Sequence, residues 1–320
     1  MTSRLPKDVR DVFESFVTTE YTTVDGRQQP ITWPVTPYYS QGAATIDITT
    51  GIGYPKKADD AIRNPRVSLL FSDPTGSGRD SACRVLVQGT AVVDDHDLEA
   101  NRERYLRDSN EKLPATKDMH PPKFMRGMLN WYYARLYVRV RPERVFVWPD
   151  ADQSKEPELL GARLEEVRSG HSEEPAAEHA PPEGGATRWD GRIEELGRRY
   201  DTAVLSWVGP DGFPLSARVP VGLDRDAGRI VVAEMPEGLP AIEGRACLTA
   251  HSHAPDFTWQ ENFQVRGDLV RDGDAWALVP HRLIGGLELP DEGRLGMARR
   301  NFSKSLRFAR TARKRLKQRG

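Results

Sequence analysis

Cysteine is scarce in this chain: its 320 residues contain two, Cys83 and Cys247, which lie far apart in strand-like segments. Free thiols are therefore predicted, because small disulfide-dependent domains have many cysteines in a short chain. Long apolar runs are missing as well, since none approaches the about 18 residues that a membrane-spanning helix needs. The N-terminal run MTSRLPKDVRDVF also contains no apolar signal core. We therefore expect a cytoplasmic protein in a reducing compartment.

The chain also lacks an excess of charge of either sign, since 46 Lys and Arg face 47 Asp and Glu and the net charge is −1. A nearly neutral molecule has no overall field that attracts nucleic acid, so no nucleic-acid partner is predicted. Hydrophobic residues make up 38% and charged residues 29% of the sequence, which is typical of a folded globular protein. The length suffices for two domains with cores of their own.

Catalytic motifs with a known mechanism are missing too. The sequence offers no Ser-His-Asp or Cys-His pattern, no H-E-x-x-H helix, no P-loop, and no G-x-G-x-x-G that follows a strand and opens a helix. His251 and His253 are spaced like neighbours on one face of a strand, but a metal needs three or four convergent ligands. We therefore predict no metal site and name no catalytic residue. His120 and His281, each beside a proline, are expected at the surface.

The most informative stretch that is present covers residues 45–74. An alternating strand ends at Thr49-Thr50 and is followed by a glycine turn that includes Gly51. A short helix then begins near Pro55, because proline suits the first turn of a helix, where its missing N–H costs nothing. Asn64-Pro65 ends this helix, and a strand of buried type follows.

Two lysines, Lys56 and Lys57, lie where this helix begins. An ammonium group there faces the positive end of the helix dipole, at a cost of roughly a few tenths of a kcal/mol. The free backbone N–H groups, the hydroxyls of Thr49 and Thr50 and the two ammonium groups would instead form a cradle for a phosphate. A solvated surface helix is the alternative interpretation, and the residues alone leave both open.

The order of these parts resembles the pyridoxamine 5'-phosphate oxidase-like family, the flavin-binding split β-barrels. The strand, the Thr-Thr-Gly turn, the lysine-led helix, Asn-Pro-Arg-Val-Ser-Leu-Leu and Asp-Pro carry the resemblance, which covers roughly residues 10 to 148. It implies that the turn at Thr49, Thr50 and Gly51, with Lys57 and its neighbour Lys56, holds the phosphate of FMN or of the deazaflavin coenzyme F-420.

The resemblance also implies which residues line the flavin ring. Thr32 and Trp33 lie on the strand that runs beside the ring in the family, and Gln88 matches a polar position that faces the cofactor. By residue type alone, Trp33 could equally belong to the core and Gln88 to a solvated strand face. The aromatic run at residues 131–133 could stack on a planar ring or pack under a loop.

A tandem duplication is predicted from the rest of the chain. Short strands separated by turn residues indicate a small split barrel, and an acidic, Pro- and Gly-rich segment is typical of a linker. Behind it the order of elements repeats, with Asp211-Gly212 following Asp25-Gly26 by 186 residues. The predicted fold is therefore β-rich (α+β), with two tandem split β-barrels at 1–150 and 189–290, a linker at 151–188 and a basic C-terminal helix at 291–320.

The two predicted copies differ at the lysine-led turn. In the second copy AEMPEGLPAIEG takes its place, which carries Glu237 and no lysine, and a carboxylate there would repel a phosphate. We therefore expect the first copy alone to bind a cofactor. The family binds its flavin in a groove between two barrels, so the pair could form within one chain, as a pseudo-dimer, or between two chains, as a homodimer.

The C-terminal segment is basic and lacks acidic residues beyond Glu292. Phe302, Leu306, Ala309 and Leu316 fall near one helical face, which we expect to pack on the barrel with the arginines in solvent. Contact of this helix with an anionic membrane or with nucleic acid is the alternative that we do not favour.

The predicted function is that of an FMN- or coenzyme F-420-dependent oxidoreductase that transfers a hydride to or from a small organic substrate. The lack of a catalytic acid, base or nucleophile fits flavin chemistry, in which the cofactor performs the transfer and the protein positions the reactants. A non-catalytic protein that binds or carries a flavin or haem is the alternative.

Overall fold

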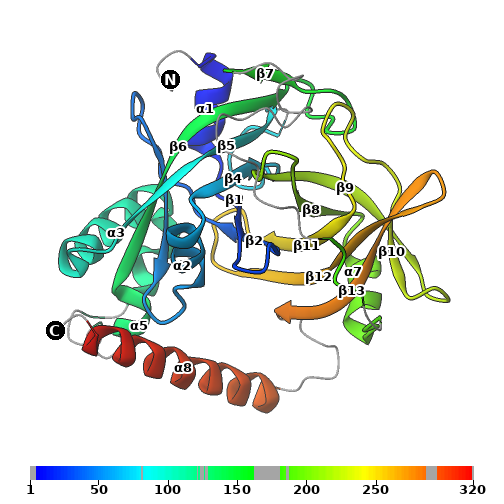
Figure 1. Ribbon diagram of the computed structural model, residues 1–320. Helices are drawn as coiled ribbons and strands as arrows, with labels where there is room; N and C mark the ends of the chain where they lie inside the picture. The colour runs from blue at the N-terminus through cyan, green and yellow to red at the C-terminus, as the bar shows by residue number, and fades with distance from the viewer. Residues whose placement is uncertain are drawn as a thin grey trace.

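The computed structural model describes residues 5–80, 82–120, 122, 126, 129–161, 181–184, 187–285 and 294–318. β-Structure dominates, in two sheets that follow one another along the chain (Figure 1). We call the segment through β7 the first copy and the segment from α7 to β13 the second copy.

The first copy contains one sheet and the helices that connect its strands. Its sheet has the order β2-β1-β4-β5-β6-β3, with β7 paired to β6. The strands are β1 (Thr19–Val24), β2 (Pro30–Val35), β3 (Ile46–Gly51), β4 (Arg66–Phe71), β5 (Arg84–Asp94), β6 (Arg135–Trp148) and β7 (Glu158–Leu160). The helices are α1 (Lys7–Ser15), α2 (Lys56–Arg63), α3 (Leu98–Lys112), the 3-10 helix η2 (Pro114–Met119) and α5 (Asn130–Tyr133).

The second copy is a closed barrel preceded by one helix. Its strands follow the order β9-β8-β11-β12-β13-β10, and β10 pairs with β9 to close it. The elements are α7 (Gly191–Arg199), β8 (Thr202–Val208), β9 (Pro214–Asp224), β10 (Arg229–Val232), β11 (Gly244–His253), β12 (Gln260–Asp272) and β13 (Ala275–Gly285). The C-terminal helix α8 (Arg294–Lys317) follows.

Both copies have the same strand order, β1 to β6 in the first corresponding to β8 to β13 in the second. They differ in closure, because β2 and β3 of the first copy are joined through the bridge Tyr38–Asp47 instead of a full ladder. The predicted fold class, a tandem pair of split barrels with a C-terminal helix, is confirmed.

The first hairpin of each copy shows the same backbone conformation. Its strands end at the pairs Val24–Pro30 and Val208–Pro214, and each five-residue loop has one residue with positive φ, Gln28 at 61° or Gly212 at 80°. Equivalent residues are therefore 184 apart, the separation of Thr22 and Ser206, and not 186 as the Asp-Gly dipeptides indicate. In consequence, Arg27 of the first hairpin is the structural counterpart of Asp211.

A β-bulge recurs at one place in both copies, next to Gly89 in β5 and Gly267 in β12. A Cβ at Gly89 would lie 2.2 Å from the carbonyl oxygen of Arg141, and one at Gly267 would lie 1.9 Å from that of Val279. Both positions therefore need glycine, because the opposite backbone comes too close for any side chain.

The two copies pack against each other within one chain. Leu70, Leu86, Phe146 and Trp148 of the first copy belong to the same apolar cluster as the core of the second. In the same interface, four buried hydroxyls lie within hydrogen-bond distance of one another. The two hairpins that supply them are related by an approximate two-fold axis. The Oγ distances are 3.0 Å for Thr22–Ser216, 2.6 Å for Thr32–Ser206, 2.9 Å for Thr22–Thr32 and 2.8 Å for Ser206–Ser216.

Buried charges join the copies beside these hydroxyls. The Glu20 carboxylate lies 2.9 Å from Arg218 Nη2 and 2.7 Å from His251 Nε2. Burial opposes ionisation, yet the hydrogen bond with His251 and the charge of Arg218 hold the pKa of Glu20 below its usual range. His253 Nε2 lies 3.2 Å from the Thr18 hydroxyl of the first copy, so both histidines contact the other copy. The described residues contain no group of three or more potential metal ligands.

Helix α8 packs on the first copy beside α5 (Figure 1). The Phe308 ring lies 5.3 Å from that of Tyr54, Ala312 is buried, and Arg315 pairs with Asp59 at 2.5 Å. Of the contact face predicted from the sequence, Leu316 packs against the apolar cluster that includes Ala312, whereas Leu306 is 44% exposed; the side chain of Phe302 lies outside the described residues. Among the described residues, no helix is both long and apolar enough to cross a membrane.

Gly267→Ala is expected to lower the free energy of unfolding by about 1–3 kcal/mol or more, because the new methyl group would clash with backbone atoms. The urea midpoint of unfolding should fall accordingly. Gly222→Ala is the matched control, because its Cβ would make an ordinary contact of 3.7 Å with Val231. Equal midpoints for the two variants would show that the bulge does not require glycine.

Candidate functional site

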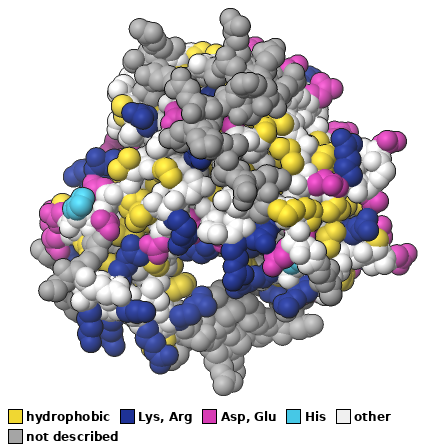
Figure 2. Space-filling model, viewed as in Figure 1, with side chains coloured by type: hydrophobic (Ala, Val, Ile, Leu, Met, Phe, Trp, Pro, Cys, Tyr) yellow, Lys and Arg dark blue, Asp and Glu magenta, His cyan; other side chains and the backbone are white. Residues whose placement is uncertain are grey.

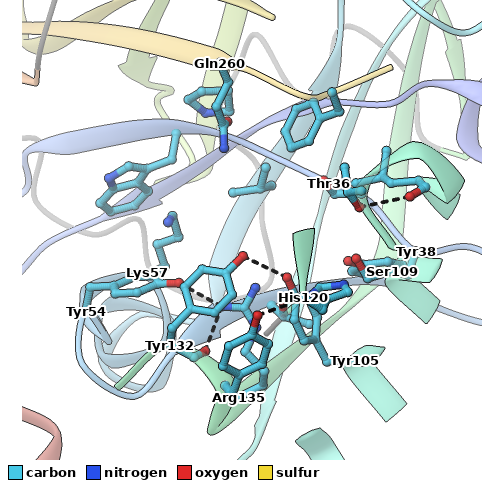
Figure 3. A pocket seen from close by; sticks show the side chains of 18 of the residues that line it. Thr36, Tyr38, Tyr54, Lys57, Tyr105, Ser109, His120, Tyr132, Arg135 and Gln260 are labelled. Carbon is cyan, nitrogen blue, oxygen red and sulfur yellow. Dashed lines mark hydrogen bonds between the residues drawn. The ribbon is translucent and has the colours of Figure 1, made fainter. Parts of the chain in front are cut away.

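A cavity of about 520 Å³ lies between the two copies. β2, β3, β6 and α2 of the first copy face the connection between β11 and β12 of the second across it (Figure 3). Its walls carry aromatic rings, hydroxyls and amides, together with Lys57, Arg135 and His120. Among the described residues that line this cavity there is no Asp or Glu. We call it the cofactor cavity, after the ligand that the sequence predicts for this region.

Lys57 projects into the cavity from the first turn of α2 (Figure 3). Its Nζ lies 5.4 Å from the centroid of the Trp33 ring and 5.6 Å from that of Tyr54. No carboxylate of the described chain comes within ion-pair distance of it. Burial, and to a smaller extent the charge of Arg135, lower the pKa of Lys57 to about 8.

Arg135 supplies the second cation, from the first residue of β6. It is 6% exposed, donates a hydrogen bond of 2.8 Å to the Tyr54 hydroxyl, and lies 3.8 Å from the centroid of the Tyr105 ring. Its Nε is buried and finds no acceptor in the part of the chain that the structure describes. Tyrosine rings and hydroxyls therefore surround this guanidinium where a carboxylate would be usual.

His120 lines the same cavity, although a surface position was expected for it. Its Nδ1 lies 3.2 Å from the Tyr133 hydroxyl. Burial and the charges of Arg126 and Arg135 lower the pKa of His120, which favours the neutral imidazole at pH 7. Its Nε2 is buried and has no hydrogen-bond partner within the described ranges.

Of the residues predicted from the sequence, Lys57, Thr49 and Trp33 line the cavity. The turn at Gly51 lies beside it, but its backbone donors are already in use. The N–H groups of Ile52, Gly53 and Tyr54 donate to the carbonyls of Ala134, Trp131 and Gly51, respectively. The Thr50 hydroxyl likewise donates to the carbonyl of Tyr54.

The structure places Lys56, Thr32 and Gln88 elsewhere. Lys56 pairs with Asp60 at 2.9 Å and with Asp25 at 3.5 Å. Thr32 belongs to the hydroxyl array between the copies, and the Gln88 amide donates to the carbonyl of Pro214 there. Thr32 and Gln88 therefore contact the second copy, and Lys56 forms ion pairs beside α2. None of the three lines the cavity.

Several cavity residues were not predicted, and Arg135 is the most important of them. The sequence contained one signal for it, because Arg135 is a cation directly before the apolar run LYV of β6. The structure then pairs Arg135 with Gly51 in the ladder. Phe257, Trp259 and Gln260 come from the second copy. No local pattern indicates that they lie near Lys57, since roughly 200 residues separate them from it.

The corresponding surface of the second copy is covered by the chain itself. Pro34 lines the cofactor cavity, and its counterpart Arg218 donates its backbone N–H to the Gln153 side chain at 3.0 Å. The Glu237 N–H, in the turn that replaces the lysine-led one, donates to the Ser154 carbonyl at 2.9 Å. The loop after β6 therefore fills the place where a second cavity would lie.

Comparison with known proteins gave matches among solved structures alone: no family model and no curated protein matches the chain. It is similar to a protein related to general stress protein 26, of the pyridoxinephosphate oxidase family, from Clostridium acetobutylicum, at 13% identity over 48% of this chain and 92% of that one, with a TM-score of 0.33.

Two further solved structures match in a similar way. HutZ, the haem storage protein of Vibrio cholerae, has 17% identity over 45% of this chain and 94% of its own, with a TM-score of 0.33. An F-420 reductase has 17% identity over 44% and 98%, with a TM-score of 0.33. Because identities and scores are this low, the fold assignment rests on the strand order and registers of the chain itself.

Lys57→Met is expected to raise the thermal midpoint of the ligand-free protein at pH 7, because it removes a cation that burial disfavours. The pKa of Lys57 falls from 10.5 to about 8 on folding. Between these values the unfolded chain binds more protons, so the wild type gains stability as pH rises through this window and the advantage of the variant shrinks. Melting curves at pH 7 and pH 10 in phosphate-free buffer test this, and a difference that does not depend on pH would contradict it.

Proposed function

We propose that this protein is a flavin- or deazaflavin-dependent oxidoreductase of the pyridoxamine 5'-phosphate oxidase-like type, which transfers a hydride to or from a small organic substrate. The cofactor cavity carries this proposal. Two cations, Lys57 and Arg135, line it together with aromatic side chains, and no carboxylate of the described residues does so. A molecule that has both a phosphate and a planar ring satisfies each of these features.

The two cations fit a phosphate because they lack a partner of opposite charge. Arg135 is buried and Lys57 is partly buried, so each has lost hydration that no carboxylate among the described residues replaces. A phosphate close to Lys57 would compensate for that loss, and Arg135 Nε, which has no acceptor among the described residues, offers a further donor. The hydroxyl of Thr49 can supply another hydrogen bond from the adjacent strand.

The ring would lie between side chains from both copies. Trp33 and Tyr54 offer flat apolar surfaces, while Trp259 and the amides of Gln260 and Asn262 reach the cavity from the second copy. When bound, a flavin or deazaflavin supplies the hydride chemistry itself. The chain's part is to bind and orient the cofactor and to exclude water, and neutral His120 can exchange a proton with a substrate placed beside it.

FMN is the first candidate and coenzyme F-420 the second, since each combines a phosphate with a tricyclic ring. The alternative function is that of a non-catalytic flavin or haem carrier. One observation favours haem: the imidazole of His120 is held neutral in the cavity and its Nε2 has no partner in the described structure, as an axial ligand of iron requires.

Titration of the purified protein with FMN, coenzyme F-420 and hemin distinguishes these functions. We expect tight binding of FMN or F-420, and Lys57→Ala should weaken it by about 1.5–3 kcal/mol, the usual worth of a hydrogen bond to a charged group. Lys56→Ala is the matched control, because Lys56 lies outside the cavity, and it should leave the affinity unchanged. A Soret band without flavin binding would favour the haem carrier, and binding that ignores Lys57→Ala would refute the proposed site.

One cofactor per chain is expected, because the chain's own loop covers the counterpart surface beside Gln153. The wild type should therefore reach saturation at a molar ratio of one in isothermal titration or by absorbance of the bound ring. A ratio of two would mean that the loop moves aside and that the second copy also binds cofactor.

A further inference from the structure

A second cavity, of about 380 Å³, lies at the tip of the β1–β2 hairpin and faces β11, β12 and β13 of the second copy. Its lining is strongly basic, and we call it the basic groove. The arginines that line it are Arg27, Arg188, Arg245, Arg266 and Arg282. Figure 2 shows Lys and Arg side chains gathered around the hollow on this face of the molecule. In contrast to the cofactor cavity, the described lining of the basic groove includes no Phe, Tyr or Trp; its one ring is that of His281, which lies 3.2 Å from the Asp268 carboxylate.

The arginines of the basic groove outnumber the acidic groups near them. The two acids in its lining are Asp25 and Glu183. Asp25 accepts hydrogen bonds from the hairpin N–H groups of Arg27 and Gln29 and pairs with Lys56, so its charge serves the hairpin and α2. Glu183 lies 3.9 Å from Arg245 Nη2, too far for a hydrogen bond.

Two of these arginines have a buried N–H group that donates to no acceptor among the described residues. The Nε atoms of Arg245 and Arg266 are inaccessible to solvent and have no hydrogen-bond partner among the described residues. Arg266 donates one bond of 3.3 Å to the Gln264 side chain, and burial lowers the pKa of Arg266. Donors left unpaired in this way cost free energy until an acceptor reaches them.

The duplication provides an internal comparison for this groove. Arg282 pairs with Arg266 at the β12 bulge, as Arg144 pairs with Gln88 at the β5 bulge, so Arg144 is the counterpart of Arg282. At the β5 bulge, Arg144 has a partner of opposite charge: the Asp211 carboxylate, from the hairpin of the second copy, lies 2.5 Å from Arg144 Nη1. Both side chains are largely buried. The Arg144 guanidinium also lies 4.4 Å from the centroid of the Phe213 ring.

The basic groove has neither of these partners. Arg27 is the counterpart of Asp211, and Gln29 is the counterpart of Phe213, because both hairpin loops have the same length and backbone conformation. A cation thus stands where the other copy has a carboxylate, and a further arginine, Arg266, replaces Gln88. The position of Asp211 marks where an anion belongs, and the first copy does not supply one.

We propose that the basic groove binds the diphosphate or triphosphate group of a small molecule, which takes the place of the Asp211 carboxylate. Guanidinium groups bind phosphate oxygens through paired hydrogen bonds. One carboxylate neutralises one arginine in the other copy, whereas Arg27, Arg266 and Arg282 together require several negative charges. The described lining offers no Phe, Tyr or Trp on which a base or other flat ring could stack, so the phosphates are the part of the ligand that this groove recognises.

Arg27→Asp tests the proposal, because it restores the carboxylate that the other copy carries. Isothermal titration with tripolyphosphate, pyrophosphate and inorganic phosphate, at constant ionic strength, should show the tightest binding for tripolyphosphate in the wild type. Arg27→Asp should weaken it by at least about tenfold, since lost hydrogen bonds between charged groups cost that much. Arg141→Asp is the matched control, because Arg141 is exposed on β6 and the change in net charge is the same.

Thermal melting gives an independent readout. Without ligand, Arg27→Asp should melt at a higher temperature than the wild type, whereas tripolyphosphate should stabilise the wild type and not the variant. Binding of FMN or coenzyme F-420 should be the same in both proteins, since Arg27 does not line the cofactor cavity.

Three results would overturn the proposal. These are no binding of tripolyphosphate by the wild type, equal weakening by Arg27→Asp and Arg141→Asp, and binding of a single-stranded oligonucleotide in preference to tripolyphosphate. The last would show that the groove follows a nucleic-acid backbone instead of holding one phosphate group.

Discussion

The packing of one barrel on the other is the constraint on which both cavities depend. Buried hydroxyls and the Glu20–Arg218–His251 cluster lie in this interface. A polar group left there without a partner would cost free energy, so the two copies can meet in one register. The β1–β2 hairpin runs through the interface, with Trp33 beside the cofactor cavity and Arg27 beside the basic groove. Both cavities are therefore fixed by the same contacts.

Duplication followed by divergence in charge explains why the two copies are unequal. The hairpins, the bulges and the strand order are the same in each, since the backbone requires them. The side chains at equivalent places differ: Lys57 belongs to a turn that carries Glu237 in the second copy, and Arg27 corresponds to Asp211. In each pair the second copy carries a carboxylate, and the first copy carries a cation that a bound anion can neutralise.

Much of the architecture could be predicted from local patterns. Turn residues and strand periodicity gave the order of elements and the repeat, and the lysine-led turn identified Lys57. The same turn also suggested Lys56, and the family resemblance suggested Gln88 and Thr32, but none of these three residues lines the cavity. A local pattern specifies which side chains share an element, but it does not specify the face of that element that meets the other barrel.

The sequence by itself determined the elements, the duplication and the turn that carries Lys57, because these depend on residues close together in the chain. Tertiary structure alone decided that Arg135 and His120 join Lys57, that Gln260 approaches from the second copy, and that Arg27 and Arg282 line one groove. These groups lie far apart in sequence, and they meet only because the core of each barrel and the interface between them leave no other arrangement of the strands.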